Sequence, residues 1–220
     1  MKRSEDIQVR LLEPAFEDAQ LKKSIEKLKE STIKKILVLP SAVSRTKNLL
    51  GNNKQILVGS VVDFPLGTGT LEKKVFEAAQ LFQEGADFLE VSINSSDILT
   101  RQEHLAELEQ LLRPLAVGRG EIIFALDTAQ YKELTLIEME QAIRTFGWQK
   151  LSLGSSLAFE KALHTLALFR YDTETEQQLQ LTINVEECTS EQLEELFQKG
   201  TAQVGIANLE AIAQLEQTSK

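Results

Sequence analysis

The amino-acid sequence predicts an α/β fold, a single-domain (β/α)8 barrel of the TIM type. Short runs rich in β-branched and apolar residues recur along the 220 residues, each followed by a longer stretch in which apolar residues return every three or four positions. That alternation is typical of a parallel sheet with crossover helices. About eight such runs are present, the number that closes a barrel, and an open doubly wound sheet is the competing architecture.

The expected strands are bounded by turn-forming residues such as Pro40 and Pro65, which follow apolar runs. They are Ile7–Leu12, Lys35–Leu39, Gln55–Val62, Phe88–Ile93, Glu121–Leu126, Trp148–Leu153, Gln178–Ile183 and Gln203–Ile206. The polar stretch 171–178 is predicted to be a solvated loop before the seventh strand.

The expected helices show the apolar spacing of one buried face. They are Phe16–Glu30, Ala42–Leu50, Leu71–Gln83, Gln102–Leu115, Leu136–Phe146, Leu157–Phe169, Ser190–Gln198 and Leu209–Leu215. Thr189 is predicted to cap the start of one of them, and Gly85, Gly147 and Gly200 each follow a helix at the position of a left-handed C-cap.

Composition supports one globular domain over residues 1–220, since 42% of the residues are hydrophobic and the length is too small for two comfortable cores. The formal net charge of -9 argues against a general nucleic-acid surface. No apolar run is long enough to span a membrane, and Met1–Arg10 lacks the apolar stretch of a signal peptide. The only cysteine, Cys188, excludes an internal disulfide, so a cytoplasmic location is expected.

The two histidines, His104 and His164, stand far apart in helical stretches without a Cys/His cluster around them. Neither a structural metal site nor a cofactor is therefore expected.

Several segments carry motifs that follow one another in order. Val61–Ala78 contains F-P-L-G, a Thr-rich helix start and K-V-F-E-A, and Gly85–Asn94 reads G-A-D-F-L-E-V-S-I-N. Lys35–Ser41 reads K-I-L-V-L-P-S, and Lys150–Gly154 reads K-L-S-L-G. Near the end, Thr189–Gly205 combines a helix start with G-T-A-Q-V-G.

These segments resemble, over nearly the whole chain, the corresponding segments of deoxyribose-phosphate aldolases. The resemblance implies a class I aldolase barrel with its chemistry at the carboxyl ends of the strands. It implies that Lys150 is the Schiff-base lysine and that Glu90 stands in the place of the acid/base aspartate. The remaining substrate-binding positions implied by the resemblance are Asn94, Ser152, Gly154, Thr182 and Gly205.

Some positions depart from the family's pattern. Thr182 stands where the family has a second lysine close to the first, so Lys150 lacks the cation that would lower its pKa. Val185-Glu186 and Ala207-Asn208 stand where the family binds phosphate, and Glu186 would repel a dianion. A phosphorylated sugar is therefore predicted to be a poor ligand.

Two local alternatives stay open. Glu90 is either a general base or the partner of Lys150 in an ion pair that keeps the amine charged. The segment Gly154-Ser155-Ser156 is predicted to be a helix cap, with anion binding as the less favoured interpretation.

The sequence thus supports two functions. The first is an aldolase-type lyase, with Lys150 and Glu90 as catalytic residues, that acts on a small aldehyde or an altered sugar. The second is a catalytically lapsed barrel that serves as a binding or regulatory protein, and this hypothesis allows for a homo-oligomer. A third, a lyase or isomerase that uses Glu90 alone, has no motif in its favour.

Overall fold

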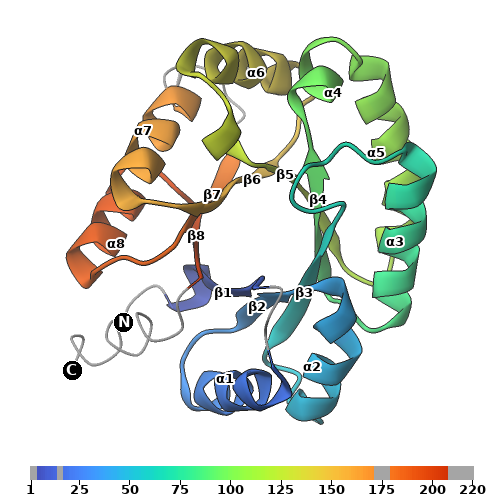
Figure 1. The fold of residues 1–220 in the computed structure, drawn as a ribbon, viewed down its shortest axis with the longest axis vertical. Helices are drawn as coiled ribbons and strands as arrows, with labels where there is room; N and C mark the ends of the chain where they lie inside the picture. Colours follow the sequence, from blue (N-terminus) through green and yellow to red (C-terminus); the bar gives the residue numbers. More distant parts are fainter. Residues whose placement is uncertain (1–3, 14–16, 171–178, 208–220) are drawn as a thin grey trace.

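The computed structural model describes residues 4–13, 17–170 and 179–207, and these form a closed parallel barrel with strands in chain order from β1 to β8 (Figure 1). Helices surround the sheet on its outside (Figure 1). The strands are β1 (Ile7–Leu11), β2 (Lys35–Val38), β3 (Leu57–Val62), β4 (Phe88–Ile93), β5 (Glu121–Leu126), β6 (Lys150–Leu157), β7 (Gln180–Val185) and β8 (Gln203–Ile206). The predicted (β/α)8 barrel is confirmed.

The helices follow the strands in the expected alternation, with one short helix added. They are α1 (Asp18–Glu30), α2 (Val43–Leu50), α3 (Leu71–Gln83), α4 (Ser95–Leu99), α5 (Gln102–Ala116), α6 (Glu133–Thr145), α7 (Phe159–Phe169) and α8 (Ser190–Gln198). Short 3-10 helices occupy Ser4–Asp6, Pro40–Ala42 and Thr128–Gln130. The predicted helix Leu209–Leu215 and the predicted loop 171–178 lie outside the described residues.

The predicted helix ends are confirmed. Gly85, Gly147 and Gly200 have φ values of +100°, +66° and +95°, a backbone region that favours glycine because it has no Cβ. Thr189 accepts a hydrogen bond from the backbone N–H of Gln192, whose side chain in turn accepts from the Thr189 N–H. This reciprocal capping box satisfies two N–H groups that the start of α8 would otherwise leave unpaired.

The sixth strand differs from its prediction at both ends, because it begins at Lys150 and continues to Leu157. Its pairing with β7 resumes at Leu157 after an irregularity that follows Leu153, where Gly154 has a φ of +75°. The prediction that Gly154–Ser156 caps a helix is wrong, because α7 begins at Phe159 after Ala158, which makes no side-chain cap. The carbonyl oxygens of Leu153 and Gly154 instead accept hydrogen bonds from Asn184 Nδ2, and Leu157 pairs with β7.

The short helix α4 was not predicted, since five residues are too few for a periodic pattern. Asn94 caps it by accepting a hydrogen bond from the Asp97 N–H. Helix α4 packs against both α5 and α6, between which it lies in Figure 1. It therefore separates α5 from α6.

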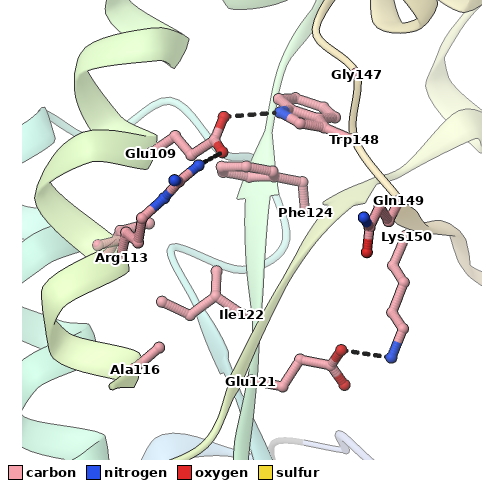
Figure 2. Close-up of a pocket in the computed structure, with 11 residues that line it drawn as sticks. Glu109, Arg113, Ala116, Glu121, Ile122, Phe124, Gly147, Trp148, Gln149 and Lys150 are labelled. Carbon is pink, nitrogen blue, oxygen red and sulfur yellow. Dashed lines mark hydrogen bonds and ion pairs between the residues drawn. The ribbon is translucent and has the colours of Figure 1, made fainter.

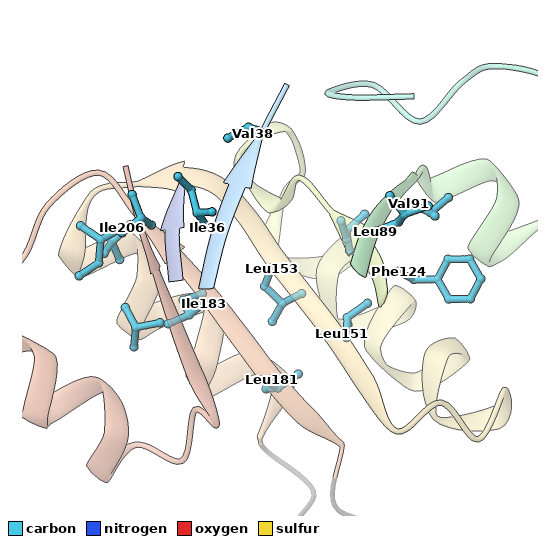
Figure 3. Packing of buried hydrophobic residues seen from close by; sticks show 14 of the residues in the cluster. Ile36, Val38, Leu89, Val91, Phe124, Leu151, Leu153, Leu181, Ile183 and Ile206 are labelled. Carbon is cyan, nitrogen blue, oxygen red and sulfur yellow. The ribbon is translucent and has the colours of Figure 1, made fainter. Parts of the chain in front are cut away.

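The main core lies between the barrel and the helices (Figure 3). Alternate residues of each strand point outward and pack on the apolar faces of the helices, as the period of two of a strand requires. Those labelled in Figure 3 are Ile36, Val38, Leu89, Val91, Phe124, Leu151, Leu153, Leu181, Ile183 and Ile206.

The residues between these outward positions point into the barrel, and their chemistry divides it. On β2 to β5 the middle of the interior is apolar, with a second core of Leu37, Val61, Phe88 and Ile123, whereas Lys35 and Glu121 lie at the amino ends and Ser92 near the end of β4. On β6, β7, β8 and β1 the interior is mostly polar, and the acidic residue Glu90 of β4 points toward the same polar group. The buried residues of this group are Gln8, Arg10, Glu90, Ser152, Thr182 and Asn184, together with Gly205.

Candidate functional site

A cavity of about 600 Å³ opens at the carboxyl ends of the strands. It is bordered by the end of β1, by α1, and by the residues at the ends of β6, β7 and β8. Its lining consists of Arg10, Leu11, Leu12, Glu13, Gln20, Lys23, Ser24, Lys27, Phe64, Ser155, Ser156, Glu186 and Ala207. Barrel enzymes place their chemistry at this end, so the cavity is the candidate ligand site.

The cavity is lined by charges of both signs. Lys23 and Lys27 come from α1, whereas Glu13 follows β1 and Glu186 follows β7. None of these four side chains forms an ion pair with another residue in the described part of the chain. Their charges are therefore available to a ligand.

A buried ion pair connects the barrel interior with this cavity. Arg10 lines the cavity, and its Nη1 donates to both carboxylate oxygens of Glu90, at 2.9 and 2.8 Å. Gln8 Nε2 donates to Glu90 Oε1 at 2.9 Å. Both charged side chains are only 2% exposed, so the pair depends on this mutual contact rather than on water.

Three buried polar atoms of this interior have no hydrogen-bond partner among the described residues: Arg10 Nε, Gln8 Oε1 and Asn184 Oδ1. Buried polar groups are rarely left unpaired, so such atoms indicate a place for water or for a ligand. Gly205 leaves room for two of these side chains, because a Cβ there would lie 2.1 Å from Asn184 Oδ1 and 2.6 Å from Arg10 Cδ.

Asn184 connects two residues that were predicted to bind substrate, Ser152 and Gly154, and also contacts Leu153 between them. Its Nδ2 donates to Ser152 Oγ at 2.8 Å and to the carbonyl oxygens of Gly154 and Leu153, at 2.8 and 3.2 Å. Thr182 is buried and pairs in register with Ser152 on the neighbouring strand. Ser152, Gly154, Thr182 and Gly205 are thus brought together around Asn184.

Lys150 lies at the opposite end of the barrel. It is the first residue of β6, and its Nζ forms an ion pair with Glu121, the first residue of β5 (Figure 2). Both side chains are about 40% exposed and line a second cavity of about 410 Å³, between α5 and the start of β6. Neither of the two predicted alternatives for Glu90 included Arg10, and Glu90 pairs with Arg10 rather than with Lys150.

Register explains why Lys150 is separated from the polar interior. Lys150 pairs with Gln180 of β7, whereas Thr182 pairs with Ser152. Two residues along a strand correspond to roughly 6.6 Å. The interior position beside Thr182 is therefore that of Ser152, and Lys150 lies one inward step closer to the amino end.

Another lysine, Lys35, lies at the same end as Lys150. It is the first residue of β2, and its Nζ lies 5.7 Å from the centre of the Phe88 ring. Burial lowers the pKa of Lys35, although the carboxylate of Glu121 opposes that effect. The amino end of the barrel is thus closed by a small group of mutually interacting charges.

The chain is similar to known proteins both in sequence and in structure. The chain is 30% identical over 135 residues to deoxyribose-phosphate aldolase of Halalkalibacterium halodurans, a match that covers 61% of this chain and 55% of that protein. It is 34% identical over 84 residues to deoxyribose-phosphate aldolase 1 of Staphylococcus aureus, 38% of each. The matched stretches thus span about half or less of these curated relatives. No family model matches the chain.

The resemblance to deoxyribose-phosphate aldolases is confirmed. Two solved structures with the same barrel cover 99% of this chain. A putative deoxyribose-phosphate aldolase from Coccidioides immitis superposes with a TM-score of 0.80 at 18% identity over 85% of its own length. A deoxyribose phosphate aldolase from Aeropyrum pernix, described as tetrameric, has a TM-score of 0.77 at 16% identity over 91%. At these identities the structures establish the shared fold.

Asn94 lies apart from the group around Asn184, although the aldolase resemblance implied a substrate-binding role for it. It is 7% exposed, and its Nδ2 donates to the Gly67 carbonyl and to Asp97 Oδ2, each at 2.7 Å. Lys74, whose pKa is lowered by burial, donates to the same Gly67 carbonyl at 2.8 Å. These contacts hold the loop between β3 and α3 in place.

Two features of the site were missed by the sequence interpretation. Arg10 was not among the predicted site residues, although its alternation with Val9 and Leu11 indicates an inward position. The lysines of α1 were not considered, because helix periodicity alone does not reveal which exposed residues border a cavity. The sequence does contain one signal for the inward positions. Glu90, Ser152 and Gly205, which all lie in the barrel interior, each follow a helix-ending glycine by five residues.

Within the described ranges, no cluster of three or more His, Cys, Asp or Glu side chains is arranged to hold a metal ion. The helices in the same ranges are all too short or too polar to cross a lipid bilayer.

Proposed function

We propose that this protein is a deoxyribose-phosphate aldolase-like barrel that binds a small molecule in its carboxyl-end cavity and has lost Schiff-base catalysis on deoxyribose phosphate. It would act as a binding or regulatory protein, in the cytoplasm and as a homo-oligomer. The similarity to curated aldolases supports the aldolase-like part of this proposal. The residues of the barrel interior support the loss of catalysis.

The register of β6 carries the proposal. A Schiff base needs an amine that faces the substrate, and an aldolase-like site would have that amine beside the position of Thr182. Ser152 is the residue in register with Thr182, and a serine hydroxyl cannot form an imine. The amine of Lys150 forms an ion pair with Glu121 at the amino end, away from that position.

The surroundings of Glu90 agree with the loss of activity. A general base must reach a substrate proton and must be free to accept it. Both oxygens of Glu90 already accept hydrogen bonds from Arg10 Nη1, so the carboxylate is engaged by its buried counterion rather than free for a substrate proton. Glu90 therefore serves to neutralise Arg10.

Borohydride trapping tests the proposal. The purified protein is incubated with acetaldehyde or deoxyribose 5-phosphate, reduced with borohydride and analysed by mass spectrometry. We expect no adduct on Lys150 above that on surface lysines such as Lys132, because Lys150 is an ion-paired, partly exposed ammonium. A selective adduct on Lys150, together with sugar-phosphate cleavage that is lost in Lys150→Ala, would sink the proposal.

A gain-of-function variant provides the converse test. Ser152→Lys places an amine in the buried interior in register with Thr182, where burial lowers its pKa. We expect this variant to trap acetaldehyde on residue 152, while Ser44→Lys, at an exposed position on α2 outside the cavity lining, does so no more than surface lysines. Circular dichroism checks that both variants are folded.

A second function remains in competition because the sequence similarity favours it: an aldolase-type lyase that acts on a small aldehyde or an altered sugar. It would use Lys150 as nucleophile and Glu90 as acid/base, with Asn94, Ser152, Gly154, Thr182 and Gly205 in contact with substrate. Trapping with a panel of aldehydes separates the two functions, since only the lyase predicts an adduct that disappears in Lys150→Ala.

A further inference from the structure

Helix α1 presents two cations to the carboxyl-end cavity. Lys23 and Lys27 are four residues apart, so their side chains lie on the same side of the helix, and both line the cavity. Lys27 is half-buried, and neither lysine has an acidic partner among the described residues. Unpaired ammonium groups beside a concave site attract an anion.

The β6 and β7 side of the cavity carries different chemistry. Strands are arranged in the order β6, β7, β8, β1, so β8 separates β6 and β7 from β1 (Figure 1). The cavity is lined both from β1 and α1 and from the ends of β6 and β7. The β6 and β7 side carries the carboxylate of Glu186 and the hydroxyl groups of Ser155 and Ser156. The Glu186 carboxylate accepts hydrogen bonds from hydroxyl or ammonium groups and repels an anion, whereas the serine hydroxyl groups both donate and accept.

The two carboxylates beside the cavity favour a ligand with a single negative charge over a dianion. Glu186 stands at the exit of β7, where a phosphate dianion would be repelled, and Glu13 adds a second unpaired carboxylate beside the cavity. A dianion would face two carboxylates, whereas a monoanion can lie against Lys23 and Lys27 at lower electrostatic cost. The volume of about 600 Å³ accommodates a compound of six carbons.

We propose that the cavity binds a small hydroxylated carboxylate, of the sugar-acid type, with its carboxylate against Lys23 and Lys27 and its hydroxyl groups toward Glu186. This ligand class rests on the proposed function, because it assumes that the carboxyl-end cavity is the ligand site. It differs from the sugar phosphate of the aldolases both in charge and in the side of the cavity that holds the anion.

Calorimetric titration of the purified protein with four probes tests the chemistry. The probes are D-gluconate, sorbitol as its neutral polyol counterpart, hexanoate as a carboxylate without hydroxyl groups, and deoxyribose 5-phosphate as a dianion. We expect gluconate to bind more tightly than the other three. Sorbitol or hexanoate binding as tightly as gluconate would overturn the proposal, and so would tighter binding of deoxyribose 5-phosphate.

Matched variants test the orientation. Lys27→Gln is expected to weaken gluconate binding roughly tenfold, the effect of one hydrogen bond to a charged group. Lys22→Gln, on the same helix but outside the cavity lining, is expected to leave binding unchanged. Glu186→Gln is expected to improve the binding of deoxyribose 5-phosphate, because it removes the repulsion. Equal effects of Lys27→Gln and Lys22→Gln would contradict the assignment.

The outcomes separate this inference from the proposed function. An adduct on Lys150 in the trapping experiment would overturn the lapsed activity without involving Lys27. Gluconate binding that is indifferent to Lys27→Gln would overturn the inference and leave the proposed function standing. A complete absence of gluconate binding overturns the inference as well, whatever the trapping result.

Discussion

A buried arginine and a buried glutamate depend on each other inside this barrel. Moving either charge out of water is costly, and their mutual attraction offsets that cost only while both are present. Arg10 and Glu90 are each only 2% exposed, and Gln8 supplies one more hydrogen bond to the carboxylate. The pair also lies at the inner end of the cavity, so it shapes the site that a ligand would enter.

The first prediction is at this scale. Arg10→Met leaves the Glu90 carboxylate buried without its counterion, and we expect the free energy of unfolding to fall by about 3–5 kcal/mol. The double variant Arg10→Met with Glu90→Leu removes both charges and should recover most of that loss. Urea denaturation measures both, and a single variant that costs under about 1 kcal/mol would show that the pair matters little.

At the scale of elements, the loop between β3 and α3 and the short helix α4 are tied together by buried polar contacts. Asn94 caps α4 and at the same time donates to the Gly67 carbonyl of the loop. Gly67 has a φ of +66° and lies so close to β4 that a Cβ there would be 2.7 Å from the Ile93 nitrogen. A side chain at this position would therefore push the loop away from the strand.

A second prediction concerns Asn94, which the aldolase resemblance assigned to substrate binding. Asn94→Ala removes a helix cap and two buried hydrogen bonds, and we expect the free energy of unfolding to fall by about 1–3 kcal/mol. Asn52→Ala, at an exposed turn, is the control and should change stability by less than about 0.5 kcal/mol. Equal stability of the two variants in urea denaturation would instead leave Asn94 free for a ligand.

At the scale of the whole molecule, the two ends of the barrel have different tasks. The amino end is closed by partly exposed charges, including the ion pair of Lys150 with Glu121. The carboxyl end carries the cavity, lined by two lysines and two glutamates that form no ion pair within the part of the chain that the structure describes. Between them the apolar shell under the helices supplies most of the stability, through burial of hydrophobic surface.

The third prediction uses Cys188, which is buried in that shell, where burial raises its pKa to about 11. The unfolded chain loses the thiol proton nearer pH 9, so between pH 9 and 11 the folded state binds more protons than the unfolded state. The stability contribution is therefore complete below pH 9 and is lost as the pH rises toward 11.

Urea denaturation of the wild type and of Cys188→Ala at a series of pH values measures this effect. We expect the wild type to lose on the order of 2 kcal/mol more than the variant between pH 9 and 11. Below pH 9 the variant is expected to be less stable because it leaves a small void, and the void penalty itself is independent of pH. Parallel pH profiles of the two proteins would show that the thiol titrates as it does in the unfolded chain.

The sequence by itself determined the barrel. Eight strand-like runs, the helix-ending glycines at 85, 147 and 200 and the capping Thr189 are local signals, and each acts within a few residues of chain. The segments matching aldolase motifs likewise made the resemblance visible. The helix α4 escaped because five residues hold no periodic pattern.

Tertiary structure decided the depth at which Lys150 lies. Lys150 and Ser152 both point inward, because side chains on a strand alternate with a period of two, so alternation does not distinguish them. The hint in the sequence is that Ser152 follows Gly147 by five residues, as Glu90 follows Gly85 and Gly205 follows Gly200. The hydrogen-bonded register with β5 and β7 distinguishes the two positions, and it places Ser152 beside Thr182 and Lys150 beside Gln180. In the same way, Arg10 and Glu90 are 80 residues apart in the chain, and closure of the barrel brings them together.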